Sequence, residues 1–384
     1  MRSTALCRFS LMALLATSAQ LLFAQTPSTQ TRSMPGPLGN TTGLRLQVSE
    51  PAVPHDPLEL VTGDAQPVET ADQRATVTQM LFQAFSLSNV RAFPYDRKTA
   101  FTSLGSASSE GNWQLEDISP GEDFYRWSAQ GPSYSVVNLF NNRMLYSDQP
   151  GAAIPLRLAQ VRSAMFFLRP VVGPRATLRT ASSNFNGISL ECILLSHMGA
   201  AKGVVGGRHW NESEYCVDTA SGTLITLSLA PGLYVLYDYS QAIHFHDRVV
   251  PNKFTITEAG RTVIEAQTTS VSDPPTNNSL FQPSGLSQVG VGALMTAPWN
   301  FPNSVPSAKV PSGSAQVVVV HGMQSPSGQI TDTGVIASSD SALDSAALNV
   351  AAKWQQRAPD DAEPGTTPQS HEILVTITFL GTGH

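Results

Sequence analysis

The chain has 384 residues, of which 41% are hydrophobic and 14% are charged, and its formal net charge is −6. This length and hydrophobic content are enough for two domains with buried cores, which excludes a chain that is disordered throughout. A nucleic-acid partner is not expected, because binding to phosphates requires clustered lysines and arginines.

The first 24 residues have the pattern of a cleaved secretory signal. Arg2 and Arg8 precede an apolar stretch over residues 9–24, which ends on the small residue Ala24. A membrane-spanning helix needs about 20 apolar residues, whereas a stretch of about fifteen is typical of a signal peptide. We therefore expect a signal peptide over residues 1–24 and a mature protein in the periplasm. If the segment is not cleaved, it would instead anchor the protein to the inner membrane.

Residues 25–69 are rich in Pro, Thr, Ser and Gly and predict an irregular segment. A helix is predicted over residues 70–87, where Thr70 or Asp72 can cap the first turn. Short strands separated by turn residues then predict an antiparallel meander, with strands at 99–105, 111–118, 124–129, 134–139 and 143–146. A second helix is predicted over residues 155–168, with Pro155 suited to its first turn and Pro170 ending the pattern.

A second series of strands follows this helix. Asn186-Gly187 is a strong hairpin signal between the first two strands of the series. The predicted strands cover residues 175–182, 188–195, 214–218, 224–229, 233–239, 243–246, 253–257 and 261–268. We therefore expect roughly ten or eleven strands to wrap around two helices.

Together with Tyr215-Cys-Val-Asp218, Ser221-Gly-Thr-Leu224 and residues 250–256, this strand rhythm resembles the half-barrel of the LolA/LolB lipoprotein-carrier superfamily over residues 70–270. The resemblance implies a curved sheet whose concave face can hold an acyl chain, with a helix as a lid. The candidate lining of such an apolar cavity is Trp113, Trp127, Leu158 and Met165. The alternative is that these residues fill an ordinary core together with Phe101 and Phe166.

Removal of the signal, which contains Cys7, would leave Cys192 and Cys216. An oxidising compartment favours a disulfide between them, which would close a loop of about 25 residues. The alternative is a pair of partly buried free thiols.

The candidate residues for metal binding or catalysis are few. His244 and His246 lie on one side of a predicted strand, about 7 Å apart, at a spacing that metal sites use, but no third ligand is evident. His209 could meet Glu212 or Glu214 on a loop, where acid/base residues often occur. The chain has no nucleophile elbow, zinc-protease motif or phosphate-binding glycine loop. We expect no enzyme activity, no cofactor and no metal, with a metal-dependent enzyme as the least favoured alternative.

Residues 271–311 are rich in Pro, Ser, Asn and Gly and predict a linker. The remainder, residues 312–384, predicts a small ββαβ domain. Its hairpin has strands at 316–321 and 329–337, its helix begins near Asp340 and ends at Trp354, and its closing strand covers residues 372–380. Ile373, Val375, Ile377 and Phe379 share one face of this strand by period-2 alternation, and a helix should cover that face.

The Ser-Pro-Ser-Gly turn at 325–328, the Leu-Asp-Ser-Ala-Ala helix start at 343–347 and the final strand ending in Phe379 resemble the TonB C-terminal domain, over residues 290–380. The resemblance implies docking on an outer-membrane receptor or another envelope protein by strand addition. The closing strand, with Ile373, Leu374, Val375, Thr376, Ile377, Thr378 and Phe379, is then expected to have one unpaired backbone edge.

The sequence thus predicts an exported α+β protein with a half-barrel domain and a TonB-like domain. The leading interpretation is a TonB-like binding or transport-accessory protein of the periplasm. The alternative is a periplasmic carrier of lipid or lipoprotein acyl chains.

Overall fold

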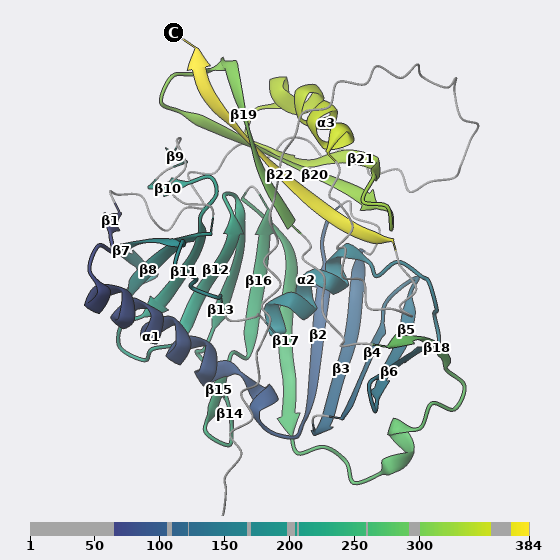
Figure 1. The fold of residues 1–384 in the computed structure, drawn as a ribbon. Coiled ribbons are helices and arrows are strands. Elements are labelled where there is room, and N and C mark those ends of the chain that lie inside the picture. The colour runs from purple at the N-terminus through teal and green to yellow at the C-terminus, as the bar shows by residue number, and fades with distance from the viewer. Residues whose placement is uncertain are drawn as a thin grey trace, which may run out of the picture. The chain divides into compact units, whose positions relative to one another are not determined.

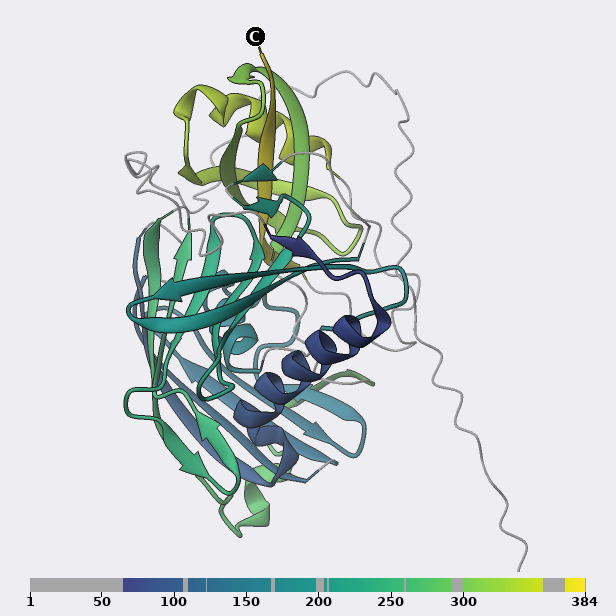
Figure 2. The same cartoon turned by 90° about the vertical axis from the view of Figure 1, so that its left-hand side faces the viewer.

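The computed structural model describes residues 65–105, 110–121, 123–166, 170–197, 204–205, 207–258, 260–291, 300–354 and 370–383. Most of its described strands belong to one antiparallel sheet of fourteen strands, ordered β1-β7-β8-β11-β12-β13-β16-β17-β2-β3-β4-β5-β6-β18. The sheet is strongly curved, and α1 and α2 lie on the same side of it (Figures 1 and 2). The predicted signal peptide and nearly all of the predicted irregular segment 25–69 lie outside the described residues.

The large sheet consists of two meanders of strands that are joined in its middle. The first meander contains β2 (Tyr95–Ser103), β3 (Gly111–Gly121), β4 (Phe124–Gln130), β5 (Ser135–Asn141) and β6 (Met144–Ser147). The second contains β7 (Thr177–Phe185), β8 (Ile188–Ser196), β11 (Ser213–Asp218), β12 (Leu224–Ala230), β13 (Leu233–Asp238), β16 (Lys253–Glu258) and β17 (Arg261–Ser272). Antiparallel pairing of β17 with β2 joins the two meanders.

The other described strands of this part of the chain are short. β1 (Gln66–Pro67) pairs with β7, and β18 (Ser287–Val291) pairs with β6. Two small hairpins form from β9 (Val204–Val205) with β10 (Arg208–His209), and from β14 (Ile243–Phe245) with β15 (Arg248–Val250). The antiparallel meanders predicted from turn spacing are therefore confirmed.

Helix α1 (Ala71–Ser88) begins with a capping box, in which the Thr70 hydroxyl accepts from the Gln73 amide and the Gln73 side chain accepts from the Thr70 amide. The box pairs two amides of the first turn, which have no partner within a helix. Val77, Leu81, Ala84 and Phe85 are buried along one face of α1 and pack against the inner face of the sheet. This helix lies where the apolar periodicity predicted it.

Helix α2 (Leu156–Met165) also lies against the inner face of the sheet, and it is shorter than the predicted 155–168. Its buried residues include Leu158, Val161 and Met165, as the helical spacing predicted. They also include Arg157, Gln160 and Arg162, which the apolar pattern did not indicate as buried.

The C-terminal sheet has four strands in the order β19-β22-β20-β21. Their bounds are β19 (Asn300–Pro311), β20 (Ala315–Gln324), β21 (Ile330–Ser338) and β22 (His371–Gly383), and η3 (Ser341–Leu343) leads into α3 (Asp344–Lys353). Ile373, Val375, Ile377 and Phe379 share a buried cluster with residues of η3 and α3, and Trp354 packs against it. The predicted order of hairpin, helix and closing strand is present.

The expectation that the closing strand has an unpaired edge is wrong. β22 pairs with β20 along one edge in antiparallel fashion and with β19 along the other in parallel fashion. Leu374, Thr376 and Thr378 therefore lie in the centre of the sheet, as do Ile373, Val375, Ile377 and Phe379. The physical reason is that β19 comes from residues 300–311, inside the segment 271–311 that composition predicted to be a linker.

Residues 44–384 form one unit, and an apolar cluster joins the two sheets within it. The cluster contains Leu156 of α2, Leu233 of β13 and, from the C-terminal sheet, Val317, Val319 and Leu374. The backbone amide of Leu156 also donates to Glu372 Oε2 over 2.5 Å. A carboxylate from the C-terminal sheet thus binds the N-terminal turn of α2, where the helix dipole favours negative charge. In the part of the chain that the structure describes, no helix is both long and apolar enough to span a membrane.

Candidate functional site

The inner face of the large sheet is the candidate site. On β2, β3 and β4 every second side chain points toward the helices, and these inward residues include Phe101, Trp113, Leu115, Trp127 and Ala129. The rings of Phe101 and Trp113 stack with centroids 5.5 Å apart. Trp113, Trp127, Leu158 and Met165, the predicted cavity lining, are all buried within this one cluster. The four residues are therefore buried in the core on the inner face, as both the cavity prediction and the ordinary-core alternative require.

Four polar residues lie buried on the same apolar face. They are Arg97 of β2, Asp117 of β3, Tyr125 of β4 and Arg162 of α2, and we call them the buried arginine cluster. The Tyr125 hydroxyl donates to Asp117 Oδ1, and Arg162 Nη2 donates to the Tyr125 oxygen over 2.7 Å. Arg162 also lies 3.7 Å from Asp117 Oδ1. The cluster thus ties α2 to the sheet.

Arg97 contacts the C-terminal end of α2. Its Nη1 donates to the Met165 carbonyl oxygen over 3.1 Å, and its Nη2 donates to Thr268 Oγ1 over 2.9 Å. Carbonyls in the last turn of a helix have no intrahelical partner, and a cation there is favourable. Arg97 therefore stabilises the C-terminal end of α2 against the sheet.

Arg162 also contacts the aromatic lining. Its guanidinium carbon lies 3.7 Å from the centroid of the Trp127 ring, within the range of a cation–π interaction. This contact places a charge directly over one of the predicted cavity residues.

The charges in the buried arginine cluster do not balance. Arg97 and Arg162 face a single carboxylate, Asp117, and no ion pair of Arg97 occurs among the described residues. A third guanidinium, that of the exposed Arg91, lies 5.3 Å from the ring of Phe166, just after α2, and 5.9 Å from the ring of Tyr125. The net charge of this region is positive whether Asp117 is ionised or neutral.

Burial shifts the pKa values of these groups. It raises the pKa of Asp117, an effect that Arg162 and the Tyr125 hydrogen bond oppose, and it raises the pKa of Tyr125. Burial also lowers the pKa of Arg97, against the opposing effect of Asp117. Perturbed groups of this kind gather at functional sites more often than in ordinary cores.

Several polar atoms of this region have no hydrogen-bond partner within the described protein. They include Asp117 Oδ2, Arg97 Nε, Arg162 Nε and the Tyr95 hydroxyl, all of them buried. An unpaired buried polar atom costs about 1–3 kcal/mol. Similar atoms occur elsewhere in the described core, for example Arg157 Nε and Tyr239 Oη, so what distinguishes the buried arginine cluster is that its unpaired donors accompany an excess of positive charge.

Sequence reasoning missed this cluster, although a signal for it exists. Arg97 is in the same alternation phase of its strand as Tyr95 and Phe101, and Asp117 is in phase with Trp113 and Leu115. A charged residue on the apolar phase of a strand must be either paired or functional. The same argument applies to Arg162, which lies four residues after Leu158 and three before Met165, at the spacing of the apolar face of α2.

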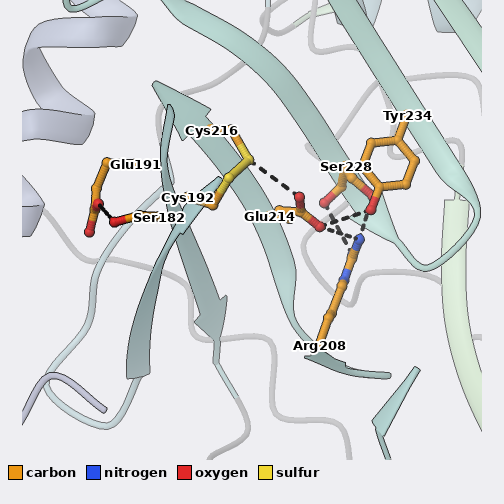
Figure 3. Close-up of a disulfide and its surroundings, with 8 residues drawn as sticks. All are labelled: Ser182, Glu191, Cys192, Arg208, Glu214, Cys216, Ser228 and Tyr234. Atoms are coloured by element: carbon orange, nitrogen blue, oxygen red, sulfur yellow. Dashed lines mark hydrogen bonds and ion pairs between the residues drawn. A yellow bond between two sulfur atoms is a disulfide. The ribbon is translucent and has the colours of Figure 1, made fainter. Parts of the chain in front are cut away.

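A second buried polar group surrounds the disulfide (Figure 3). The predicted bond between Cys192 and Cys216 is confirmed, and it joins directly opposite residues of β8 and β11. Glu214 Oε1 lies 3.3 Å from Cys216 Sγ, and Glu214 Oε2 accepts from Tyr234 over 2.9 Å and pairs with Arg208 over 3.4 Å. Every charge here has a partner, so the arrangement is structural. Burial raises the pKa of Glu214, and Arg208 opposes that shift.

The histidines that the sequence singled out lie apart from the inner face. His244 is exposed on β14, and His246 stacks on Phe93 and lies 3.3 Å from Asp273. His209 Nδ1 lies 3.8 Å from Glu212, whose two carboxylate oxygens are also bound by Arg179 over 2.6 and 2.8 Å. Within the described ranges, the one group of three potential metal ligands is Cys192, Glu214 and Cys216, and the disulfide uses both sulfurs.

A glycine next to Trp113 offers a test of this packing. A Cβ added at Gly131 would overlap the indole of Trp113, whereas one added at Gly121 would meet no atom within 4 Å. We expect Gly131→Ala to lower the free energy of unfolding by about 1–3 kcal/mol, because a buried ring must move. Urea unfolding followed by tryptophan fluorescence measures this loss. Gly121→Ala is the matched control, and an equal effect of the two substitutions would contradict the packing described here.

The chain matches no protein-family model and no curated protein. Solved structures resemble it at low sequence identity. A LolA superfamily protein from Nitrosomonas europaea is 11% identical over 53% of this chain and 96% of its own, with a TM-score of 0.37. A DUF1329 family protein from Desulfovibrio piger is 8% identical over 58% of this chain and 100% of its own, with a TM-score of 0.38. Likenesses of this size assign the chain to no family and no activity.

Proposed function

We propose that this protein is an exported, non-catalytic carrier of the cell envelope that binds an acyl chain of a lipid or lipoprotein on the inner face of its large sheet. The observation that carries the proposal is the nature of the contact between α2 and that face. The helix covers apolar and aromatic side chains, yet Arg157, Gln160 and Arg162 are buried in the same contact.

Such a contact makes α2 suited to act as a lid. Separating the helix from the sheet exposes apolar surface, which costs roughly 25 cal/mol per Å². The same separation breaks the ion pairs of Arg157 with Glu258 and of Arg162 with Asp117, and hydration of the freed charges offsets several kcal/mol of that loss. An acyl chain that takes the place of the helix would also restore the lost apolar burial. The opened state is therefore less costly than it would be for a wholly apolar helix.

Export is supported by the chain's start and by its disulfide. The apolar stretch at residues 9–24 follows basic residues, as in a secretory signal, and a structural disulfide is typical of proteins in oxidising compartments. The proposed location is the periplasm.

Docking of an outer-membrane receptor on β22 does not form part of this proposal, because both edges of that strand are paired. If the C-terminal sheet binds an envelope partner by strand addition, as its resemblance to TonB implies, the available edges are β19 and β21. β19 contains Pro302, Pro306 and Pro311, which lack amide donors, so β21 is the better candidate.

Contact quenching by brominated lipids tests the carrier proposal. Stearic acid and stearyl alcohol, each brominated at mid-chain, should quench the fluorescence of Trp113 and Trp127 saturably, with one chain bound per protein. The double variant Trp113→Phe, Trp127→Phe should lose most of this quenching. Trp354→Phe is the control, since Trp354 packs against the α3 cluster of the C-terminal sheet. Absence of saturable quenching by both lipids would refute the proposal.

A further inference from the structure

The position of Arg97 indicates what kind of headgroup the ligand carries. Its side chain is 2% exposed, it projects from the middle strand β2 into an apolar face, and its cationic charge has no carboxylate within ion-pair distance among the described residues. A buried arginine of this kind costs several kcal/mol unless an anion accompanies it. The fold therefore maintains a cation at a place where the protein supplies no matching anion.

We propose that Arg97 binds the acidic headgroup of the carried lipid, a carboxylate or a phosphate, while the acyl chain lies against the aromatic inner face. This inference rests on the proposed function. The unpaired Arg97 Nε supplies a donor for a headgroup oxygen. Guanidinium groups suit this role, because their planar array of donors matches carboxylate and phosphate oxygens.

Arg97 also connects binding to the position of α2. Its Nη1 now donates to the Met165 carbonyl at the end of the helix, and Nη2 donates to Thr268 on β17. An anionic oxygen is a stronger acceptor than a neutral carbonyl. A bound headgroup therefore competes with Met165 for Arg97 and releases the C-terminal end of α2, which lies across the middle of the sheet (Figure 1).

Two arginines, one exposed and one buried, contact the ring of Phe166 just after α2. Arg91 is exposed in η1 (Val90–Ala92), and its guanidinium carbon lies 5.3 Å from the Phe166 ring centroid. The guanidinium carbon of the buried Arg97 lies 5.8 Å from the centroid of the same ring. Positive charge thus leads from the surface to the buried arginine cluster, and it attracts an anion along this path.

The experiment compares lipids that share one chain and differ in headgroup. Mid-chain brominated stearic acid, the corresponding alkyl phosphate and the corresponding alcohol are titrated into the full-length mature protein and into Arg97→Met. We expect an acidic lipid to bind the wild-type protein at least about tenfold more tightly than the alcohol, and Arg97→Met to remove that preference, so that acid and alcohol bind the variant about equally. The two acidic lipids show whether the site prefers carboxylate or phosphate.

Arg126→Met is the matched control. Arg126 lies on β4 but faces the opposite side of the sheet, where it pairs with Glu116 over 3.4 Å. Its replacement removes one arginine without touching the inner face, so the preference for acidic lipids should persist.

The outcomes separate this inference from the proposed function. If acid and alcohol bind the wild-type protein equally well, the headgroup assignment is wrong and the carrier proposal stands. If no lipid quenches, both are wrong. If Arg97→Met does not fold, the wild-type comparison of acid with alcohol still decides the matter. Arg97→Lys keeps the charge but loses the planar donor array, so it should reduce the preference for acid over alcohol.

Discussion

Replacing Glu258 by Gln is expected to lower the free energy of unfolding by about 3–5 kcal/mol. Glu258 and Arg157 are each 2% exposed, and their closest approach is 2.5 Å. Gln160 adds to the pair, since it accepts from Arg157 over 2.8 Å and donates to Glu258 over 2.7 Å. The glutamine removes the negative charge but keeps the side-chain shape, so Arg157 remains buried without its counter-ion.

Chemical unfolding of the wild-type protein and of Glu258→Gln measures this effect. The control is the double variant Arg157→Met, Glu258→Gln, which removes both charges and keeps an acceptor for Gln160. Its stability should return most of the way to that of the wild-type protein, because no unpaired charge is left in the interior. A double variant as unstable as the single one would show that the loss comes from packing and not from the charge.

Removal of the disulfide is expected to lower the free energy of unfolding by a similar amount. The double variant Cys192→Ala, Cys216→Ala should lose about 2–5 kcal/mol of stability, since the bond closes a loop with a sequence separation of 24 residues and so restricts the unfolded chain. Both cysteines are fully buried in a cluster with Leu190 and Leu194, so the loss also includes poorer packing. Urea unfolding of oxidised protein, obtained by export through its own signal, gives the comparison.

Reduction provides the internal control for this prediction. A reductant should lower the stability of the wild-type protein toward that of the alanine variant and leave the variant itself unchanged. Mass spectrometry of the exported wild-type protein should find no free thiol. Two free thiols in that material, or a variant as stable as the oxidised protein, would contradict a structural disulfide.

Local signals in the sequence predicted much of the large sheet. Thr70 and Gln73 form a capping box before an apolar helical face, and Asn186-Gly187 forms a hairpin turn, because both depend on residues close together in the chain. The pairing of Cys192 with Cys216 was predictable for a different reason, since removal of the signal proposed for residues 1–24 would leave two cysteines, which have one possible intramolecular bond. The aromatic residues of the inner face followed from strand alternation.

Long-range pairing is where the sequence-based predictions were wrong or incomplete. β22 was expected at an edge because its parallel partner β19 is rich in proline and lies in a segment that composition assigns to a linker. The pairing of β17 with β2 joins strands far apart in the chain. The residue pattern of neither strand identifies the other as its partner. Propensity describes one strand at a time, whereas sheet order depends on which edges remain free after folding.

By itself, the sequence determined the antiparallel meanders, the two helices against them, the disulfide pair and the apolar residues that gather on one face. These properties depend on neighbours within a few residues, or on the small number of available partners. The tertiary structure alone decided that Arg97, Asp117, Tyr125 and Arg162 meet beneath α2 with unequal charges. Their placement required the curvature of the sheet and the position of a helix at once, because a charged residue on a strand shows its partner only when the other elements have packed against it.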